Sequence, residues 1–126
     1  RALIYFLHAI SCCNDSKAIN SKGVFYTNAG FTLYHLGEED QAQIYIDKAI
    51  RCFENSNALW GRAKAHSYAA LLAISRKDTE NAKKHFEEAK KSAFKGGNPD
   101  SLALIDEITP LIADYLKSSE ALHRTG

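Results

Sequence analysis

Histidine, cysteine and serine are the side chains of this sequence that could carry covalent or metal chemistry. The histidines show no HxxxH or HExxH pair, the spacing that brings two imidazoles of one helix to the same ion. They are scattered along the chain at His8, His35, His66, His85 and His123. No nucleophile elbow frames a serine, and no glycine-rich loop offers a cradle for phosphate. We therefore expect no catalytic residue, no metal ion and no cofactor, and a protein that is not an enzyme.

Three cysteines, Cys12, Cys13 and Cys52, also argue against a zinc site or a disulfide framework. Their number is odd, and no CxxC or Cys/His ligand spacing accompanies them. Cys12 and Cys52 lie 40 residues apart, the separation that equivalent packing positions would have in a repeat of that length. We expect small buried thiols in a reducing cytoplasm. A redox switch through the adjacent Cys12 and Cys13 is the alternative.

The charge balance indicates neither a nucleic-acid surface nor a membrane surface. In 126 residues, 16 Lys and Arg stand against 15 Asp and Glu, so the formal net charge is +1. Lysines between Lys83 and Lys95 form a stripe, but glutamates interleave with it, as on a solvated helix face. No apolar run reaches the ~20 residues that a bilayer requires. We expect a cytoplasmic protein that binds neither a membrane nor, directly, nucleic acid.

The elements that hold these side chains repeat with a period of 40 residues. In the stretch from Gly30 to Ile50, small and bulky residues recur at helical spacing. The same set stands forty residues later and forty residues earlier: Ala42, Ile46 and Ala49, then Ala82, Phe86 and Ala89, and before them Ala2, Phe6 and Ala9. A constant offset of this size is the signature of a repeat array.

Apolar residues at spacings of three and four predict helices throughout the chain. Capping residues divide it into helices over about 1–13, 17–36, 39–54, 58–76 and 80–94. Gly37 and Asp78 mark two of the breaks, and Asn98 with Pro99 starts the last segment. Because Pro110 interrupts that segment, we expect either two short helices or one kinked helix that ends near Ser119. About seven helices and no strand predict an all-α antiparallel stack.

Two glycines lie inside the helix expected over 17–36, where each costs about 1 kcal/mol relative to alanine. Close approach of a neighbouring helix is the expected reason for Gly30. The sequence offers no specific reason for Gly23. Small residues such as Ala49 are expected where the two helices of a pair meet, so Ala49→Leu should overpack that contact by ~1–3 kcal/mol.

The repeated unit resembles a tetratricopeptide (TPR) repeat. Its first copy has the aromatic, small and glycine opening, the turn glycine and the second-helix pattern of that family, in Tyr26, Ala29, Gly30, Gly37, Ala42, Ile46 and Ala49. The second copy has Lys77 where the turn glycine is usual, and its other matching residues are His66, Ala69, Ala70, Ala82, Phe86 and Ala89. The period of 40 exceeds the usual ~34 residues. Longer repeats of this kind resemble those of bacterial signalling proteins, including peptide-sensing transcription regulators.

The resemblance implies an α-solenoid of antiparallel helix pairs that winds into a right-handed superhelix. Residues 1–126 then form a single TPR-like domain. Its parts are the second helix of a truncated repeat over 1–16, repeats over 17–56 and 57–96, and capping helices over 97–120. Because the sequence starts with Arg1 rather than Met, we expect a fragment of a larger bacterial regulator.

The same resemblance implies a concave surface formed by the first helix of each pair. The side chains expected there are Thr27, Asn28, Phe31, Tyr34, His35, Lys64, Ser67, Tyr68 and Leu71. Asn28 matches the asparagine that hydrogen-bonds the backbone of an extended peptide in many members of the family. Lys64 and Tyr68, four residues apart, could hold a carboxylate and an apolar side chain. The implied function is a non-enzymatic module that binds a protein or peptide partner in a sensing or scaffold role.

Two alternatives to peptide binding stay open. In one, Asn28 is a solvated consensus residue, while Phe31 and Tyr68 pack against an adjacent repeat. In the other, the chain is an assembly element that forms a homodimer through its terminal repeats. Phe6 and Ala9 are the expected dimer contacts, because the truncated first repeat leaves them without a covering helix.

Overall fold

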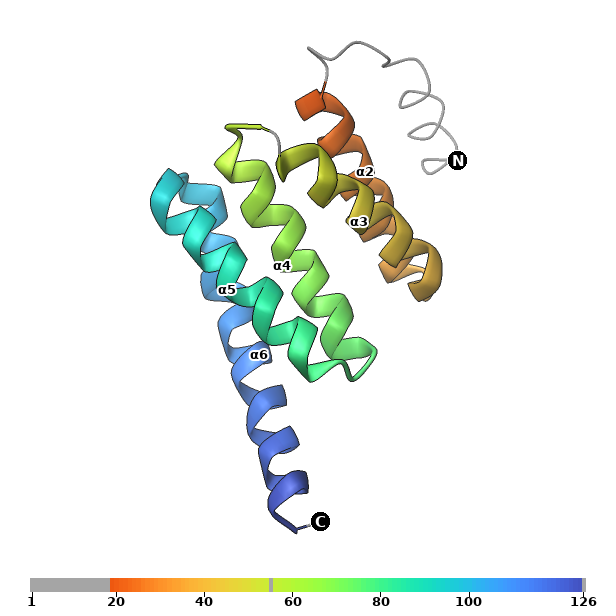
Figure 1. Ribbon diagram of the computed structural model, residues 1–126, viewed down its shortest axis with the longest axis vertical. Coiled ribbons are helices and arrows are strands. Elements are labelled where there is room, and N and C mark those ends of the chain that lie inside the picture. Colours follow the sequence, from red (N-terminus) through yellow and green to blue (C-terminus); the bar gives the residue numbers. More distant parts are fainter. Residues whose placement is uncertain (1–18, 55, 126) are drawn as a thin grey trace.

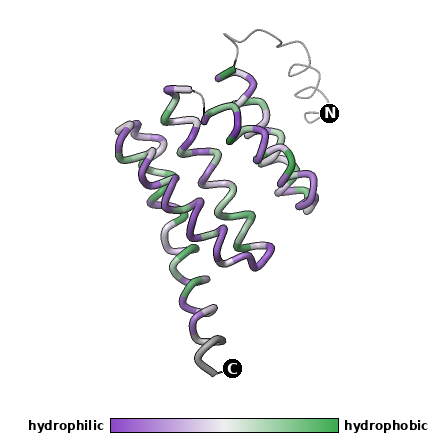
Figure 2. The backbone as a smooth tube through the Cα atoms, in the orientation of Figure 1, coloured by the Kyte–Doolittle hydropathy of each residue, from purple (hydrophilic) through white to green (hydrophobic). Residues whose placement is uncertain are grey.

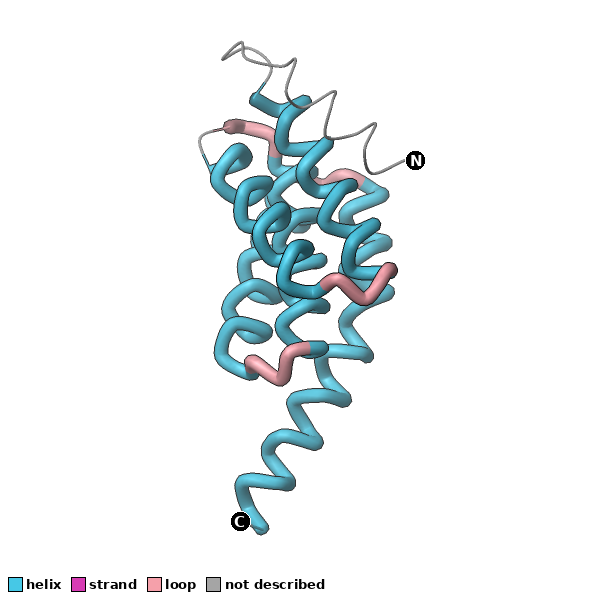
Figure 3. The backbone as a smooth tube through the Cα atoms, turned by 90° about the vertical axis from the view of Figure 1, so that its right-hand side faces the viewer, coloured by secondary structure: helices cyan, strands magenta, loops and turns pink. Residues whose placement is uncertain are grey.

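The structure, a computed structural model, describes the backbone of residues 19–54 and 56–125. Within them the chain forms five α-helices and no strand (Figure 1). The helices are α2 (Ile19–His35), α3 (Glu39–Glu54), α4 (Leu59–Ser75), α5 (Thr79–Gly96) and α6 (Pro99–Thr125). Short loops join them, as the side view shows (Figure 3). The predicted all-α class is confirmed for this part of the chain.

The last segment is one helix, because α6 runs without interruption through Pro110. Pro110 and Asp106 are both exposed, so water can bond to the Asp106 carbonyl, which lacks its usual N–H partner. In the same turn the Thr109 hydroxyl donates to the Ile105 carbonyl at 2.6 Å. Of the two alternatives for this segment, the structure has the single helix, which ends at Thr125 and not near Ser119, so the count of seven helices is not confirmed. The helix predicted over 1–13, with the truncated repeat over 1–16, lies outside the described residues.

Consecutive helices pack as two pairs, α2 with α3 and α4 with α5 (Figure 1). The loops within the pairs are so short that the two helices of each pair run antiparallel. The pairs meet through α3 and α4, and also through α2 and α4, while α6 lies against α4 and α5. Among the described helices, α4 is thus in contact with all the others.

The turns inside the two pairs are equivalent at the 40-residue offset. The Glu38 N–H donates to the carbonyl five residues earlier at 2.9 Å, and the Asp78 N–H does the same at 2.8 Å. This bond closes a Schellman motif, in which the preceding residue is left-handed. That residue is Gly37 in the first turn, with φ +82°, and Lys77 in the second, with φ +59°. The turn geometry is therefore shared, although only the first turn has the glycine.

The buried core residues recur at the same 40-residue offset. The alanines expected between paired helices are buried in both copies: Ala29, Ala42 and Ala49 in the first pair, and Ala69, Ala82 and Ala89 in the second. The bulky residue between the last two alanines, Ile46 or Phe86, is also buried. Ala49 and Ala89 thus occupy matching places, whereas Ala9 lies outside the described residues. Small side chains let the two backbones of each pair approach closely.

Glycines make room for the largest buried side chain, Phe53, at the joint between the pairs. Its side chain is 1% exposed. A Cβ atom added to Gly23 of α2 would lie 2.5 Å from the Phe53 ring, and one added to Gly61 of α4 would lie 2.3 Å from it. The predicted close approach at Gly30 is confirmed, since a Cβ there would lie 2.6 Å from Ile46 of α3. Each of these glycines therefore has a packing partner on a neighbouring helix.

Hydrophobic and hydrophilic residues alternate along the described helices (Figure 2). This pattern suits helices that bury one face against their neighbours and leave the other in water. None of the helices in the described ranges combines the length and the apolar character needed to cross a membrane.

Candidate binding cavity

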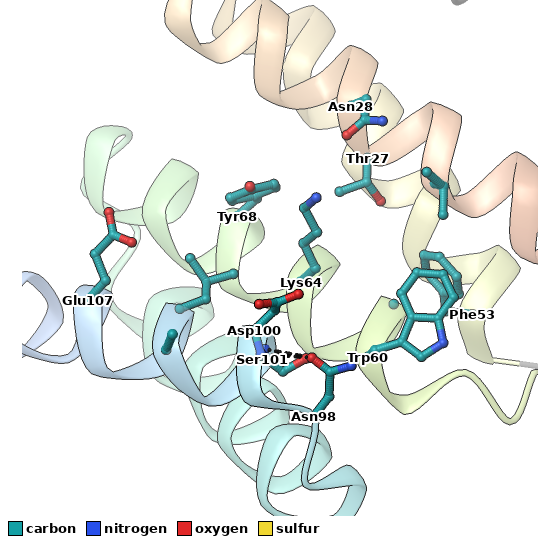
Figure 4. A pocket seen from close by; sticks show the side chains of 14 residues that line it. Thr27, Asn28, Phe53, Trp60, Lys64, Tyr68, Asn98, Asp100, Ser101 and Glu107 are labelled. Carbon is teal, nitrogen blue, oxygen red and sulfur yellow. Dashed lines mark hydrogen bonds between the residues drawn. The ribbon is translucent and has the colours of Figure 1, made fainter.

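A cavity of about 480 Å³ lies between α2, α4 and α6, with Phe53 of α3 at its edge (Figure 4). We refer to it as the α2–α4–α6 cavity. Its lining residues are Val24, Thr27, Asn28, Phe53, Trp60, Gly61, Lys64, Tyr68, Asn98, Asp100, Ser101, Ala103, Leu104 and Glu107. The first helix of each pair and the last helix therefore each contribute one wall.

The α4 wall carries a stripe of three large side chains. Trp60, Lys64 and Tyr68 recur every four residues, so they share one face of the helix. The Lys64 side chain extends from α4 into the cavity, toward the α2 residues (Figure 4). No carboxylate among the described residues forms an ion pair with it. The ammonium group is therefore available to an oxygen atom of a ligand.

Two aromatic rings lie at opposite ends of that stripe. Trp60 is 43% exposed, and its ring meets Phe53 edge to face with the centroids 5.9 Å apart. Tyr68 stacks on Phe31 of α2 at a centroid distance of 4.6 Å. Burial raises the pKa of Tyr68, and the carboxylate of Glu107 raises it further. Tyr68 thus keeps its hydroxyl proton at neutral pH and can donate it in a hydrogen bond.

Asn98 sets the start of α6 and with it the third wall. Its side-chain oxygen accepts the backbone N–H groups of Asp100 at 2.9 Å and Ser101 at 3.1 Å, which is the role of an N-cap. Asp100 and Glu107 then stand two turns apart, and both line the cavity. With Lys64 opposite them, the lining offers carboxylates on α6, an ammonium group on α4 and aromatic rings at both ends.

Four of the nine residues predicted on the concave surface line this cavity: Thr27, Asn28, Lys64 and Tyr68. Asn28 is half-buried on α2, and its amide lies above the end of the Lys64 side chain (Figure 4). Thr27 is only 2% exposed, and its hydroxyl donates to the Gly23 carbonyl at 2.7 Å. The chemistry on the α2 side therefore rests on the amide of Asn28.

Ser67 is not on the concave surface where the sequence places it. It is fully buried, and its hydroxyl donates to the Ala63 carbonyl at 2.7 Å. Thr27 makes the same bond forty residues earlier, so both hydroxyls are satisfied inside their own helix. Because this bond removes the cost of burying the hydroxyl, a polar residue can occupy the core side of the helix.

Three further predicted residues, Phe31, Tyr34 and Leu71, line a separate gap of about 10 Å³ between α2 and α4, which is too small for a ligand. The stacking of Phe31 on Tyr68 is the packing foreseen in the alternative interpretation. His35 is exposed and meets Phe31 edge to face at 4.2 Å. The proposed dimer contacts, Phe6 and Ala9, lie outside the described residues.

The concave surface predicted from the sequence includes neither Trp60 nor any residue of the α6 wall. The 40-residue period would have predicted this wall, because Asp100, Leu104 and Glu107 lie forty residues after Trp60, Lys64 and Ser67. Interpreting residues 97–120 as a cap hides this continuation. The helix α6, whose lining residues follow this offset, is therefore part of the cavity.

A second cluster of ionisable side chains lies between α4 and α5. The Nδ1 atoms of His66 and His85 are 3.0 Å apart. Burial lowers the pKa of His66 to about 4, helped by the neighbouring His85, and burial also lowers the pKa of His85. Both imidazoles are therefore neutral at pH 7, and one donates a hydrogen bond to the other. Within the described ranges, no group of three or more metal-ligating side chains comes together.

Cys52 is buried near the end of α3 as a free thiol. Burial raises its pKa, although Lys22 and Arg51 act in the opposite direction. A buried thiol with a raised pKa is poorly reactive, which fits the packing role expected for it. Cys12 and Cys13, the pair considered for a redox switch, lie outside the described residues.

Comparisons with known proteins give no relative with which this cavity can be compared. No protein-family model matches the chain, no curated protein matches it, and no solved structure matches it. The chemistry and geometry of the side chains are therefore the basis for a functional proposal.

Proposed function

We propose that this chain is a non-enzymatic interaction module whose α2–α4–α6 cavity binds an extended segment of a partner protein. The observation that carries the proposal is the convergence of α2, α4 and α6, which start successive 40-residue units, on one cavity. The architecture we propose is a TPR-like α-solenoid of helix pairs, in which α6 continues the series. A volume of about 480 Å³ is within the range of natural ligand sites.

The lining suits a peptide better than a compact metabolite. Asn28 can donate to and accept from a peptide backbone, and Lys64 can bind a carboxylate or carbonyl oxygen. Trp60 and Tyr68 offer ring faces to apolar side chains. Along the helix axis these two rings are separated by about 12 Å, since each residue rises about 1.5 Å. Groups spread over that distance are matched by a chain of several residues.

The resemblance to repeats of bacterial signalling proteins supports a sensing or scaffold role within a larger regulator. In such a role, the partner segment would be recognised by shape and by a few hydrogen bonds, without chemical change. Repeat scaffolds serve many tasks, so the identity of the partner has to come from a binding experiment.

Selection from a phage-displayed library of random peptides, followed by fluorescence anisotropy with a labelled selected peptide, tests this function. Asn28→Ala should weaken binding by about 1 kcal/mol or more, roughly fivefold, which is the scale of a hydrogen bond left unmade. Lys64→Ala should weaken it by a similar factor if the peptide carries a carboxylate near α4.

Gln41→Ala is the matched control, since Gln41 is an exposed amide on α3 outside the cavity. It should leave the affinity unchanged, and circular dichroism should show all variants to be folded. Retention of full affinity by both Asn28→Ala and Lys64→Ala would show that the cavity is not the binding site. Failure of the library to yield any specific peptide would count against peptide recognition altogether.

A further inference from the structure

The Nδ1 atoms of His66 and His85 lie at a separation that two ligands of one metal ion can have. Their Nδ1 atoms are 3.0 Å apart, one on α4 and the other on α5. Two imidazole nitrogens bound to one ion at about 2.0–2.1 Å, with about 90–109° between the bonds, lie about 2.8–3.4 Å apart. We propose that His66 and His85 bind one borderline divalent transition-metal ion, of the class of Ni²⁺, Cu²⁺ and Zn²⁺, through these Nδ1 atoms.

Binding requires a change of tautomer and a turn of the two rings, because in the hydrogen bond each Nδ1 points at the other and not at a shared ion. In the metal-free protein one Nδ1 carries a proton and donates it toward the other. When the ion binds, that imidazole carries its proton on Nε2 instead, and both Nδ1 lone pairs form bonds to the ion. Because burial keeps both rings neutral at pH 7, no proton is released to the solvent. Binding to a thiol would release one.

Charged groups from three helices and one loop surround the pair. Carboxylates and cations act on the two rings, and they are Asp47 on α3, Asp78 in the loop before α5, Glu88 and Lys84 on α5, and Arg62 on α4. Three of these groups are negative and two are positive. At His85 three carboxylates act against one ammonium group, and this excess of negative charge offsets part of the cost of placing a dication there.

A polar cavity of about 410 Å³ reaches His85 from the side of α3. Gln43, Asp47, Asp78 and Asn81 are among its lining residues. It gives the ion a path from solvent and room for water ligands. Because no third metal-ligating side chain joins the cluster in the described part of the chain, water completes the coordination. We therefore expect reversible binding that a chelator removes.

The first helix pair does not have this site. Tyr26 and Tyr45 occupy the equivalent positions forty residues earlier, and their rings stack with the centroids 6.1 Å apart. The Lys48 ammonium lies 5.6 Å from the centroid of each ring. Replacing both histidines by tyrosine therefore removes the metal ligands but keeps an aromatic pair that the same helix arrangement already accommodates.

Isothermal titration calorimetry of the full chain with Ni²⁺ tests the proposal, with Cys12→Ser and Cys13→Ser in every sample to remove competing thiols. His66→Gln and His85→Gln should each weaken Ni²⁺ binding by about tenfold or more, because each removes one of two ligands. The double variant H66Y/H85Y should abolish binding at this site. His35→Gln removes an exposed histidine elsewhere and should leave the affinity unchanged.

Two further measurements separate this site from binding elsewhere on the surface. Titrations in buffers of different ionisation enthalpy should show no proton release at pH 7, and the Cu²⁺ complex should show electron paramagnetic coupling to two nitrogens. Ni²⁺ affinity that survives both glutamine variants, or that falls equally with His35→Gln, would mean adventitious binding and would overturn the proposal. Circular dichroism verifies folding, and the tyrosine pair serves if a glutamine variant unfolds.

Discussion

At the scale of single residues, the two Schellman turns form a matched pair. Gly37 and Lys77 both adopt the left-handed conformation, with φ +82° and +59°. A residue with a Cβ atom loses about 1 kcal/mol or more there, whereas glycine does not. Apart from Gly37 and its two neighbours in the chain, no described residue has an atom within 4 Å of a Cβ built on Gly37. The effect of a side chain at this position is therefore conformational rather than steric.

Lys77→Gly should raise the free energy of unfolding by about 0.5–1 kcal/mol, because relief of the backbone outweighs the entropy that glycine adds to the unfolded chain. Gly37→Lys copies the second turn into the first and should lower it by about 1 kcal/mol. Urea denaturation measures both changes. Lys83→Gly, on the exposed face of α5, is the control and should lower the free energy by about 1 kcal/mol. Changes of equal sign at the two turns would contradict their shared geometry.

The histidine pair makes stability depend on pH. Burial lowers the pKa of His66 from 6.5 to about 4 and lowers that of His85 as well. Between pH 6.5 and about pH 4, the unfolded chain binds protons that the folded chain excludes. Above pH 6.5 the pair therefore does not lower the free energy of unfolding. As the pH falls through this window, protons bind preferentially to the unfolded chain, and the free energy of unfolding decreases progressively.

Thermal unfolding of the parent chain and of H66Y/H85Y, in the presence of a chelator, tests this dependence. The melting temperature of the parent should fall more steeply than that of the double variant between pH 6.5 and about pH 4. Carboxylates contribute to both curves, so the difference between them isolates the histidines. Parallel curves would show that the pair does not titrate differently in the folded and unfolded chains.

At the scale of helices, side-chain volumes compensate one another where the pairs join. Phe53 fills the space next to Gly23 and Gly61. Forty residues later the equivalent positions hold Ala93 in place of the ring, and Ala63 and Ser101 in place of the glycines, and all three are buried. One large residue with two glycines thus corresponds to one small residue with two larger neighbours.

Gly61→Ala should lower the free energy of unfolding by about 1–3 kcal/mol, because its Cβ would lie 2.3 Å from the Phe53 ring. At an unobstructed helix position the same change would raise it by up to about 1 kcal/mol. Combined with Phe53→Leu, which shortens the side chain, Gly61→Ala should cost less than it does alone. Urea denaturation of the two single variants and the double variant gives the coupling. Strict additivity would mean that the ring is not the obstacle.

The sequence predicts helices well wherever a local residue starts or ends them. Asp78 accepts the Asn81 N–H at 3.2 Å, and Asn98 caps α6, as their residue types indicate. The prediction fails where distant packing or exposure decides. Pro110 is tolerated because it faces water, and Gly23 has its reason in Phe53, thirty residues away. Neither fact can be read from the residues that flank these positions.

Residues of the candidate sites could be predicted from the sequence where spacing within one helix places them, but not where contacts between helices do. The spacing of Lys64 and Tyr68 on one helix face places both in the cavity, because helical periodicity survives folding. Ser67 has a polar side chain, but a bond inside its own helix allows it to be buried. His66 and His85 are nineteen residues apart on different helices, so only the packing of α4 on α5 brings them together. No spacing rule for a single helix would detect that pair.

At the scale of the whole molecule, α4 connects both candidate sites. It carries Lys64 and Tyr68 in the α2–α4–α6 cavity and His66 in the contact with α5. Among the described helices, the backbones of α2 and α6 do not approach each other closely, whereas both approach α4, so α4 joins the two outer walls of the cavity. A helix that packs against several others can open only when those contacts are lost. The helix with the most neighbours should therefore be the last to open.

Amide hydrogen exchange of the full chain should be slowest in the helix that contacts the most other helices and fastest where a helix has few contacts. Amides around Ala69, in the buried middle of α4, should exchange only through global unfolding, whereas those near Lys117, where α6 is exposed, should exchange through local opening. A peptide bound in the cavity should slow exchange in α2 and α6 more than in α5, because it bridges two walls whose backbones do not pack against each other. Equal protection of α4 and the end of α6 would contradict the order. Slowing confined to α5 would place the peptide elsewhere.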